Sequence, residues 1–331
     1  MPAFKKNIVV EVAKGVRAYL KLDVGVTRRG IEELRAKPYG NGSDVVAGSG
    51  VRPENIVWIF GSGRSGSTWL SSMMGDIEGH ALWGEPWVGT LFGNYYYREI
   101  EKSKHQAPHF IMGPHRETWL GSIRNFVLDG ARAIFSGLSQ DGYLIIKEPN
   151  GSIGAPLLME ALPESRMILL TRDPRDVVAS SMDARREGGW HYEKNKQRLQ
   201  DGKVLADKNP VAFVKGRAKR YLEGMGKAKE AYDAHRGHKV LVKYEDLRAD
   251  TLRTMKHIYS TLEVPVSEEE LARVVEKHSW ENIPEDKKGE GKFYRKAAPG
   301  GWREDLTPRQ AEAVEEITAP LMKELYPEEV R

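Results

Sequence analysis

The stretch IFGSGRSGSTWL, residues 59 to 70, decides the fold, because it has the spacing of a phosphate-binding loop between a strand and a helix. Glycines let such a loop turn tightly and direct its amide groups at an anion, and the helix N-terminus adds partial positive charge. A plain glycine-rich turn is the alternative interpretation. We predict that an anion is bound by the loop residues Gly61, Ser62, Gly63, Arg64, Ser65, Gly66, Ser67 and Thr68.

The lysine that follows the second glycine in kinases and ATPases is missing, because Ser67 stands in its place. In those enzymes the lysine spans the β- and γ-phosphates, and an aspartate after a later strand helps to hold magnesium. Here the apolar run RMILLT (166–171) is followed by Arg172. Both departures argue against magnesium-assisted γ-phosphoryl transfer and favour a nucleotide with a single 5′-phosphate group.

Apolar, β-branched runs alternate with helical segments along the chain. Strands are expected at 55–60, 143–147, 166–171 and 239–244, with helices after residue 65, from Pro174, near 246–262, near 267–277 and from 307. This alternation predicts an α/β fold in three layers, with a central parallel sheet flanked by helices. Ligands of such sheets bind at the carboxyl ends of the strands, so every strand exit is a candidate site.

The composition indicates a folded protein with an anionic small ligand. Hydrophobic residues make up 40% and charged residues 30%, which is typical of globular chains. Cysteine is absent, which excludes disulfides and thiolate metal sites, and no run of about 18 apolar residues predicts a transmembrane helix. The net charge of +4 is too small to indicate nucleic-acid binding. We expect a cytoplasmic protein with a basic helical lead and linker at 1–50 and one main domain at 51–331.

The segment TRDPRDVVAS places a second set of phosphate ligands at a strand exit. Arg172 directly follows the strand, and Ser180 comes two helical turns later. A guanidinium binds phosphate through two hydrogen bonds, and a hydroxyl completes the shell. A surface ion pair of Arg172 with Asp173 or Asp176 is the alternative.

These two segments together resemble the sulfotransferases that use 3′-phosphoadenosine 5′-phosphosulfate (PAPS). In that family the loop before the helix binds the 5′-phosphosulfate, and an R-(N/D)-P-x-D-x-x-x-S segment binds the 3′-phosphate. The resemblance implies a P-loop NTPase-like fold and metal-free, in-line transfer of a sulfuryl group to a hydroxyl or amine. It also implies PAPS as the donor and adenosine 3′,5′-bisphosphate (PAP) as the product. This donor has no γ-phosphate, which agrees with the missing lysine.

Two further segments extend the resemblance. KFYRKAAPGGWRED (292–305) is similar to the family's F-x-R-K-G-x-x-G-D-W-K loop. This implies that Arg295 binds the 3′-phosphate, with Lys296 and the amide of Ala297 nearby, although Ala297 replaces the family's glycine. EKHSWENIP (276–284) is similar to the segment that carries the adenine-binding aromatic residue, which implies stacking on Trp280 and Trp69. Packing in the core is the alternative for both tryptophans.

The catalytic assignments also follow from the resemblance. Arg64 occupies the position of the family's catalytic lysine or arginine and stays protonated, so it would stabilise charge on the leaving oxygen. Lys147 matches a lysine that the family directs at the transferred group. The histidine base of many cytosolic members is missing, because Glu148 and Pro149 follow Lys147.

A glutamate is the expected general base. The tyrosylprotein group uses a glutamate soon after the first helix, and Glu85 is in a comparable place. Its neighbours Trp83 and Trp87 suggest surroundings that raise its pKa. Glu148 is the reserve candidate, and an exposed loop carboxylate is the alternative for Glu85.

The acceptor and the rival functions stay open at this level. Phenolic, glycan, lipid and other small-molecule hydroxyl acceptors all fit, and the acceptor region is expected at 80–140 and 188–210. The family's dimer segment has Pro308 in place of valine, which leaves a homodimer open. The rivals are a P-loop small-molecule kinase, which the missing lysine disfavours, and a non-catalytic nucleotide-binding protein.

Overall fold

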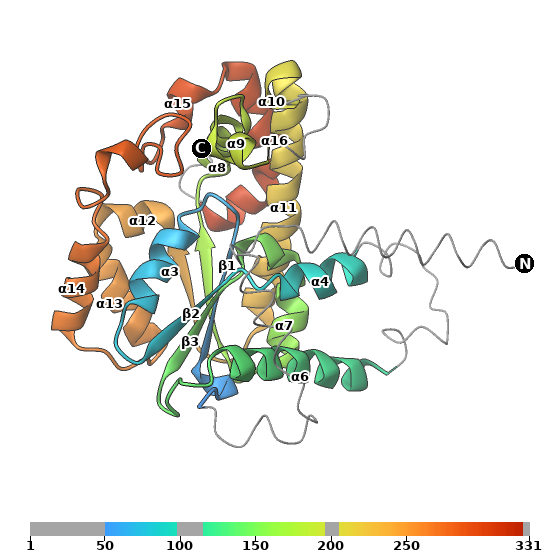
Figure 1. Ribbon diagram of the computed structural model, residues 1–331. Helices are drawn as coiled ribbons and strands as arrows, with labels where there is room; N and C mark the ends of the chain where they lie inside the picture. The colour runs from blue at the N-terminus through green and yellow to red at the C-terminus, as the bar shows by residue number, and fades with distance from the viewer. Residues whose placement is uncertain (1–49, 98–114, 196–204, 327–331) are drawn as a thin grey trace, which may run out of the picture. The chain divides into compact units, whose positions relative to one another are not determined.

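The computed structural model describes residues 50–97, 115–195 and 205–326, which contain one parallel sheet (Figure 1). The strands are β1 (Ile56–Gly61), β2 (His80–Gly84), β3 (Tyr143–Lys147), β4 (Arg166–Thr171) and β5 (Lys239–Lys243). They lie in the order β2-β3-β1-β4-β5, and every neighbouring pair is parallel. The predicted α/β fold with a central parallel sheet is confirmed. The predicted lead at 1–49 lies outside the described residues.

Helices connect the strands and surround the sheet. The longer ones are α3 (Ser67–Gly75), α4 (Val88–Tyr95), α6 (Arg116–Ile134), α8 (Pro174–Arg185), α11 (Pro210–Ala234), α13 (Thr251–Thr261), α14 (Glu268–Lys277) and α16 (Pro308–Leu325). The shorter ones are α7 (Ala155–Ala161), α9 (Trp190–Asn195), α10 (Leu205–Lys208), α12 (Tyr244–Ala249), α15 (Trp302–Asp305) and the 3₁₀ turns η1 (Pro53–Asn55), η3 (Pro149–Gly154) and η4 (Glu285–Lys287). None of the described helices combines the length and the apolar character that crossing a bilayer requires.

The central strand β1 shows why both faces of the sheet are covered. Its alternate side chains point to opposite faces, so Trp58 and Phe60 join one hydrophobic cluster while Val57 and Ile59 join another. All of them are fully buried. Helices α6, α7, α11 and α16 line the first cluster, and α3, α13 and α14 line the second, which gives the three layers seen in Figure 1. This double burial fixes β1 in the centre and so fixes the loop that follows it.

Two local predictions were incomplete. The strand β2 was not predicted, because it lies at the edge of the sheet and its residues are only half buried, so its sequence HALWG lacks a continuous apolar run. The helix expected near 246–262 is two helices, because the backbone is extended at Asp250. The carboxylate of Asp250 accepts a hydrogen bond from the amide of Arg253 and so caps α13.

The helix that follows β4 begins as predicted and positions the second set of candidate ligands. The carboxylate of Asp173 accepts a hydrogen bond from the amide of Arg175, and Pro174 is the first helical residue. Arg172 therefore lies between the end of a buried strand and a capped helix, at the same edge of the sheet as the loop after β1.

Candidate active site

The loop between β1 and α3 is a tight turn that opens a helix. Gly66 has φ 88°, and a Cβ atom there would lie 2.5 Å from the ring of Tyr244, so the position requires glycine. Ser65 closes the turn, because its Oγ donates to the carbonyl of Ser62 at 2.7 Å. Arg64 also adopts positive φ, at 76°, which is rare for a residue with a side chain. The loop is thus the tight strand-to-helix turn that the sequence predicted.

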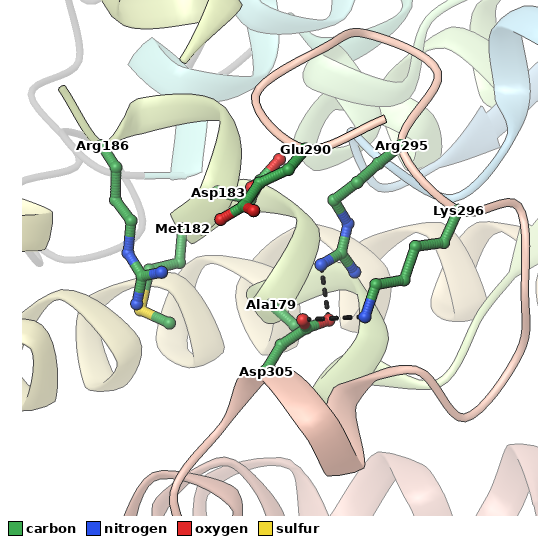
Figure 2. Close-up of a pocket in the computed structure, with 8 residues that line it drawn as sticks. All are labelled: Ala179, Met182, Asp183, Arg186, Glu290, Arg295, Lys296 and Asp305. Atoms are coloured by element: carbon green, nitrogen blue, oxygen red, sulfur yellow. Dashed lines mark hydrogen bonds and ion pairs between the residues drawn. The ribbon is translucent and has the colours of Figure 1, made fainter. Parts of the chain in front are cut away.

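The segment from 290 to 305 closes against α8 and forms a small pocket of about 130 Å³. Figure 2 shows Arg295 and Lys296 pointing together at Asp305, with which both form ion pairs. Asp183 and Glu290 also line this pocket, so it contains both signs of charge. The predicted cations Arg295 and Lys296 therefore lie on one wall of a pocket beside α8, where Asp305 pairs with both.

Ala297 takes up the backbone conformation that a glycine usually supplies. Its φ is 50°, in the left-handed region, where a side chain is unfavourable. Its carbonyl accepts a hydrogen bond from Nε of Arg248 at 2.9 Å. The turn is therefore formed with alanine in place of glycine, and the side chain of Arg248 holds its backbone.

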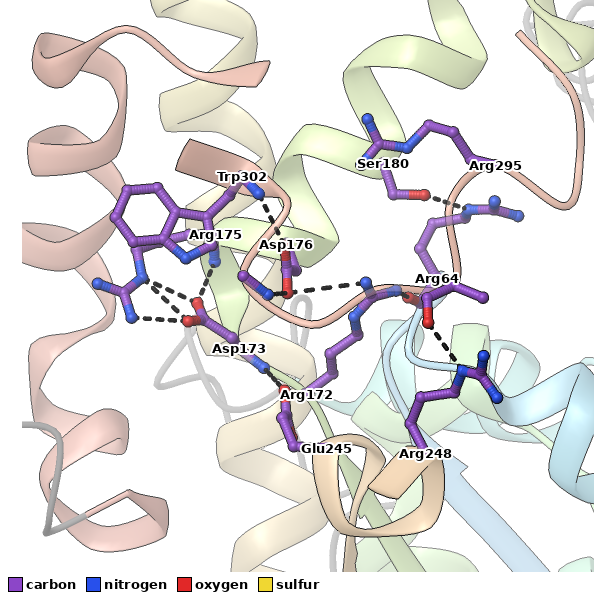
Figure 3. A network of polar contacts seen from close by, with 12 residues as sticks. Arg64, Arg172, Asp173, Arg175, Asp176, Ser180, Glu245, Arg248, Arg295 and Trp302 are labelled. Atoms are coloured by element: carbon purple, nitrogen blue, oxygen red, sulfur yellow. Dashed lines mark hydrogen bonds and ion pairs between the residues drawn. The ribbon is translucent and has the colours of Figure 1, made fainter. Parts of the chain in front are cut away.

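Arg64 and Arg172 converge on α8, as Figure 3 shows. Nε of Arg64 donates to Oγ of Ser180 at 3.0 Å, and its Nη2 donates to the carbonyl of Phe293 at 2.8 Å. Nη1 of Arg172 donates to the carbonyl of Arg64 at 3.0 Å. Three segments far apart in the sequence, from the loop after β1, from α8 and from the loop before α15, therefore meet at one place.

The resemblance places Arg64 at the 5′-phosphosulfate and Ser180 at the 3′-phosphate, but in the structure the two side chains contact each other. The guanidinium of Arg64 bonds Ser180, which was predicted to bind the 3′-phosphate, and lies 4.9 Å from the ring centroid of Phe293 and 5.5 Å from that of Trp190. Phe293 was not predicted as a site residue, and Trp190 was predicted only as part of the acceptor region at 188–210. The position of Phe293 two residues before the predicted ligand Arg295, in the segment FYRK, was the available signal for it.

The meeting point is rich in positive charge and poor in water. Burial is the main cause that lowers the pKa of Arg64 to about 10, and the nearby guanidinium groups of Arg172, Arg185 and Arg295 lower it further. Arg172 has its guanidinium 4.2 Å from the ring centroid of Tyr244, and its Nε is buried without a hydrogen-bond partner among the described residues. Its closest carboxylate is Asp176, at 3.7 Å. Gathered, desolvated cations of this kind favour a bound anion.

Asp176 holds the third segment against α8. Its two carboxylate oxygens accept hydrogen bonds from the amides of Gly300 and Trp302, at 2.8 and 2.9 Å. This carboxylate was considered in the sequence only as a surface partner of Arg172. The structure buries it completely and uses it to position the loop that carries Arg295.

A second group of residues surrounds Glu85 at the ends of β2 and β3. Nζ of Lys147 lies 2.7 Å from one carboxylate oxygen of Glu85, and the amide of Asn150 donates to the other at 2.8 Å. Nζ of Lys147 also donates to Oγ1 of Thr68, at 3.3 Å, which links the group to the anion loop. The predicted residues Thr68, Glu85 and Lys147 are thus brought together, and Asn150 is an additional member.

The surroundings of Glu85 differ from the expected apolar ones. Trp83 packs against Phe135, with ring centroids 5.9 Å apart, and Trp87 is 44% exposed. The neighbours of the Glu85 carboxylate are polar instead, namely Lys147 and Asn150. The strand β2 ends at Gly84, and the backbone turns at Glu85 and Trp87, where φ is 54° and 63°, so the regular spacing of a strand does not place the two tryptophans around the glutamate.

Glu148, the reserve base, is turned away from this group. It is 1% exposed and accepts hydrogen bonds from the amides of Trp87 and Gly89 at the start of α4. Burial raises its pKa to about 8. Its contacts support the backbone of the segment that follows Glu85.

The two tryptophans assigned to adenine stacking lie in connected segments. Nε1 of Trp69 donates to the carbonyl of His278, at 2.8 Å, and His278 comes two residues before Trp280. The guanidinium of Arg248 lies 5.8 Å from the ring centroid of Trp69, and Nζ of Lys288 lies 5.2 Å from that of Trp280. Both rings therefore lie beside cations near the anion loop. Within the described residues, no group of three or more acidic or histidine side chains has a metal-binding arrangement.

Comparison with known proteins identifies the relatives of this chain. A family model described as a sulfotransferase domain matches residues 54–326. An amine sulfotransferase of Oryctolagus cuniculus is 26% identical over 181 residues, which cover 49% of this chain and 56% of that protein. A cytosolic sulfotransferase of Arabidopsis thaliana is 24% identical over 281 residues, which cover 78% of this chain and 69% of that one. The match thus spans little more than half of the rabbit relative.

Solved structures share the fold. A mouse sulfotransferase crystallised with PAP has a TM-score of 0.50 and 15% identity, and the match covers 84% of this chain and 88% of that one. A Mycobacterium avium sulfotransferase has a TM-score of 0.51 and 15% identity, with 83% and 77% covered. The fold expected from the resemblance is confirmed.

Proposed function

This chain belongs to the family of sulfotransferase domains, and from that premise we propose that it transfers the sulfuryl group of PAPS to a hydroxyl or amine acceptor. The observation that carries the proposal is the convergence of Arg64, Arg172 and Ser180 at the strand ends, where cations are gathered and largely withdrawn from water. The rival kinase would need a metal-binding aspartate where β4 instead leads into Arg172.

The residues at the site fit the two charged ends of this donor. We assign the 3′-phosphate to Arg172, Ser180 and Arg295, with Lys296 and the amide of Ala297 nearby. The buried, unpartnered Nε of Arg172 supports this assignment, because it lacks only an acceptor. We assign the 5′-phosphosulfate to the amides of the loop Gly61–Thr68 and the adenine to Trp69 and Trp280. When bound, the donor supplies a sulfuryl group activated by its bond to phosphate.

Arg64 and Lys147 stabilise the negative charge that develops on the departing phosphate oxygen. A guanidinium has five N–H groups, and Arg64 uses two of them on Ser180 and Phe293, so three are left for an anion. Nζ of Lys147 approaches Thr68 at the end of the anion loop. Fixed cations in a site with little water are the most effective arrangement for such charge.

Glu85 takes the proton from the attacking hydroxyl. Its two oxygens are held by Lys147 and Asn150, which fixes the direction of the carboxylate. Glu148 is buried beneath the same segment and holds its backbone amides, so we assign it a structural role. We further propose that the acceptor is a small-molecule hydroxyl or amine compound and that the protein is cytoplasmic. A homodimer remains one of the possible oligomeric states. Pro308 begins α16, so the dimer segment of the family here starts a helix.

The test is turnover of radiolabelled PAPS with a broad panel of hydroxyl and amine acceptors, followed by the mass shift of sulfation. We expect at least one acceptor to be sulfated without added metal, and we expect PAP to inhibit the reaction. Tight PAP binding without transfer to any acceptor, and without slow transfer to water, would favour the non-catalytic alternative.

A further inference from the structure

A second group of basic residues lies near Arg64, and the sequence assigned no individual role to any of them. Arg185 is the last residue of α8, His191 lies in α9, and Arg217 and Arg220 belong to α11. We call these four residues the α8–α11 basic cluster. They lie outside the segments that resemble the donor-binding motifs.

The helix α8 separates this cluster from the donor arginines. Ser180 accepts a hydrogen bond from Arg64, and the next residue, Ser181, accepts one from Nη2 of Arg217 at 3.4 Å. Successive helical residues point about 100° apart, so the two hydroxyls serve two different groups of cations. Trp190 bridges the groups, because its ring centroid lies 5.5 Å from the guanidinium of Arg64 and 5.5 Å from the ring of His191. The cluster is therefore adjacent to the donor site and distinct from it.

Among the residues that the structure describes, Arg185 and Arg217 form no ion pair, whereas other half-buried arginines do. Arg175 pairs with Asp173, and Arg295 pairs with Asp305. By contrast, Arg217 bonds the neutral hydroxyl of Ser181, and its Nε is buried with no hydrogen-bond partner in the part of the chain that the structure describes. Two half-buried guanidinium groups, those of Arg185 and Arg217, thus lie on neighbouring helices with little compensation, and the exposed Arg220 adds a third positive charge nearby, as an anion site requires.

The electrostatics of the cluster agree with this geometry. Burial and then the charges of Arg185 and Arg220 lower the pKa of Arg217 to about 9. Burial and then Arg185, Arg217 and Arg64 lower the pKa of His191 to about 4. The His191 imidazole is therefore neutral at physiological pH, and the arginines supply the positive charge. An incoming anion would relieve the repulsion between them.

We propose that the α8–α11 basic cluster binds a carboxylate, sulfate or phosphate group of the acceptor, so that the acceptor is an anionic hydroxyl or amine compound. This inference rests on the proposed sulfuryl transfer, since it names the acceptor class for the same site. In the proposed function the 3′-phosphate of the donor already has Arg172, Ser180 and Arg295 as ligands, and the 5′-phosphosulfate has the amides of the loop Gly61–Thr68. An acceptor anion held here lies next to Arg64, the residue that both groups share as a neighbour.

The first experiment measures binding of inorganic sulfate to the PAP-saturated protein by equilibrium dialysis at low ionic strength. We expect one sulfate to bind, and we expect Arg217→Gln or Arg185→Gln to weaken it by about tenfold or more. Lys219→Gln is the matched control, because it removes the same charge from an exposed position of α11, and it should have little effect. Equal sulfate binding by the wild type and Arg217→Gln overturns the proposal.

The second experiment tests that the anion belongs to the acceptor. Hydroxy acids and their methyl esters are compared as acceptors, and we expect a lower KM for the acids. Arg217→Gln should raise the KM for the acids by about tenfold while leaving kcat and the KM for the esters nearly unchanged. Equal KM values for acids and esters in the wild type, or no turnover of any acid, contradict the inference.

The controls separate failure of this inference from failure of the proposed function. If PAP does not bind the wild type, the proposed function fails. Sulfate binding is then measured without PAP, and it tests whether the α8–α11 basic cluster binds an anion. If PAP binds and sulfate does not, only the inference about the acceptor fails. If Arg217→Gln and Arg185→Gln lose PAP affinity as strongly as sulfate affinity, the cluster belongs to the nucleotide site and the inference is wrong. Arg217→Lys keeps the charge and replaces Arg217→Gln if that variant does not fold.

Discussion

The donor end and the base end of the candidate site balance their charges in different ways. At the base end, Lys147 and Glu85 form an ion pair at 2.7 Å, and Asn150 holds the second carboxylate oxygen. At the donor end, Arg64 bonds a neutral hydroxyl and a neutral carbonyl, although other guanidinium groups surround it. The charges of the base end are therefore paired, whereas Arg64 at the donor end has no carboxylate partner among the described residues. Changes at the two ends should accordingly alter different properties of the enzyme.

Removing the positive charge of Arg64 at the donor end should have the largest effect on the rate. We expect Arg64→Ala to lower kcat by about 10²–10³-fold, the loss typical of a missing charge-stabilising group. Because Arg64 is buried among like charges, the variant without nucleotide should be as stable to heat as the wild type, or more stable. Steady-state kinetics and thermal unfolding check both statements. A wild-type rate would remove Arg64 from the mechanism.

Removing the base should affect the rate and spare nucleotide affinity. We expect Glu85→Gln to lower kcat by about 10²–10⁴-fold, the usual contribution of a general base, while PAP affinity stays nearly unchanged. Gln is a close match in shape and can still contact Asn150. Glu148→Gln is the control and should retain most of the rate. If Glu148→Gln loses the rate and Glu85→Gln does not, our assignment of the base is wrong.

The 3′-phosphate assignment predicts a smaller and more selective loss. Arg172→Ala should weaken PAP binding by about 10–100-fold, as expected for lost hydrogen bonds to a charged group. Binding of adenosine 5′-phosphosulfate, which lacks the 3′-phosphate, should change far less. Competition binding with the two nucleotides measures the difference. Equal losses for both would show that Arg172 acts on the fold and not on this phosphate.

The smallest effect concerns stability and pH. Burial raises the pKa of Glu148 to about 8 from an unfolded value near 4.5, so the folded state holds this proton more tightly. The contribution of Glu148 to stability is therefore fully present below about pH 4.5 and is lost as the pH rises toward 8. Glu148→Gln should reduce this slope, as judged by urea unfolding across the range. An unchanged slope in the variant would assign the pH dependence to other groups.

The buried strands and the helix starts were predictable from the sequence because they follow from local chemistry. Ile56–Gly61 is a continuous apolar run, and Asp173-Pro174 is a strong helix start. The loop after β1 and the segment after β4 could therefore be located from the sequence. The edge strand β2 was not predictable, because half-buried residues lack a clear period. The division of the chain at residue 50 and the lead before it stay predictions.

The contacts within the site were less predictable than its members. The sequence predicted that Arg64, Arg172 and Arg295 share one site, but only the structure shows that the guanidinium of Arg64 donates to Ser180. Asn150 could not be assigned, because its amide reaches Glu85 across two loops that are 65 residues apart in the chain. Likewise, the expected apolar setting of Glu85 rested on its sequence neighbours Trp83 and Trp87, but the backbone turns at Glu85 and Trp87, where φ is positive, and the sequence does not show this turn.

The central claim is that the gathered arginines form a site for a doubly phosphorylated adenosine. Calorimetric titration of the wild-type protein with PAP in the presence of a metal chelator tests this claim most directly. We expect tight, metal-independent binding of one PAP, and we expect much weaker binding of ATP whether or not magnesium is present. Tight ATP binding that depends on magnesium, together with weak binding of PAP, would contradict it.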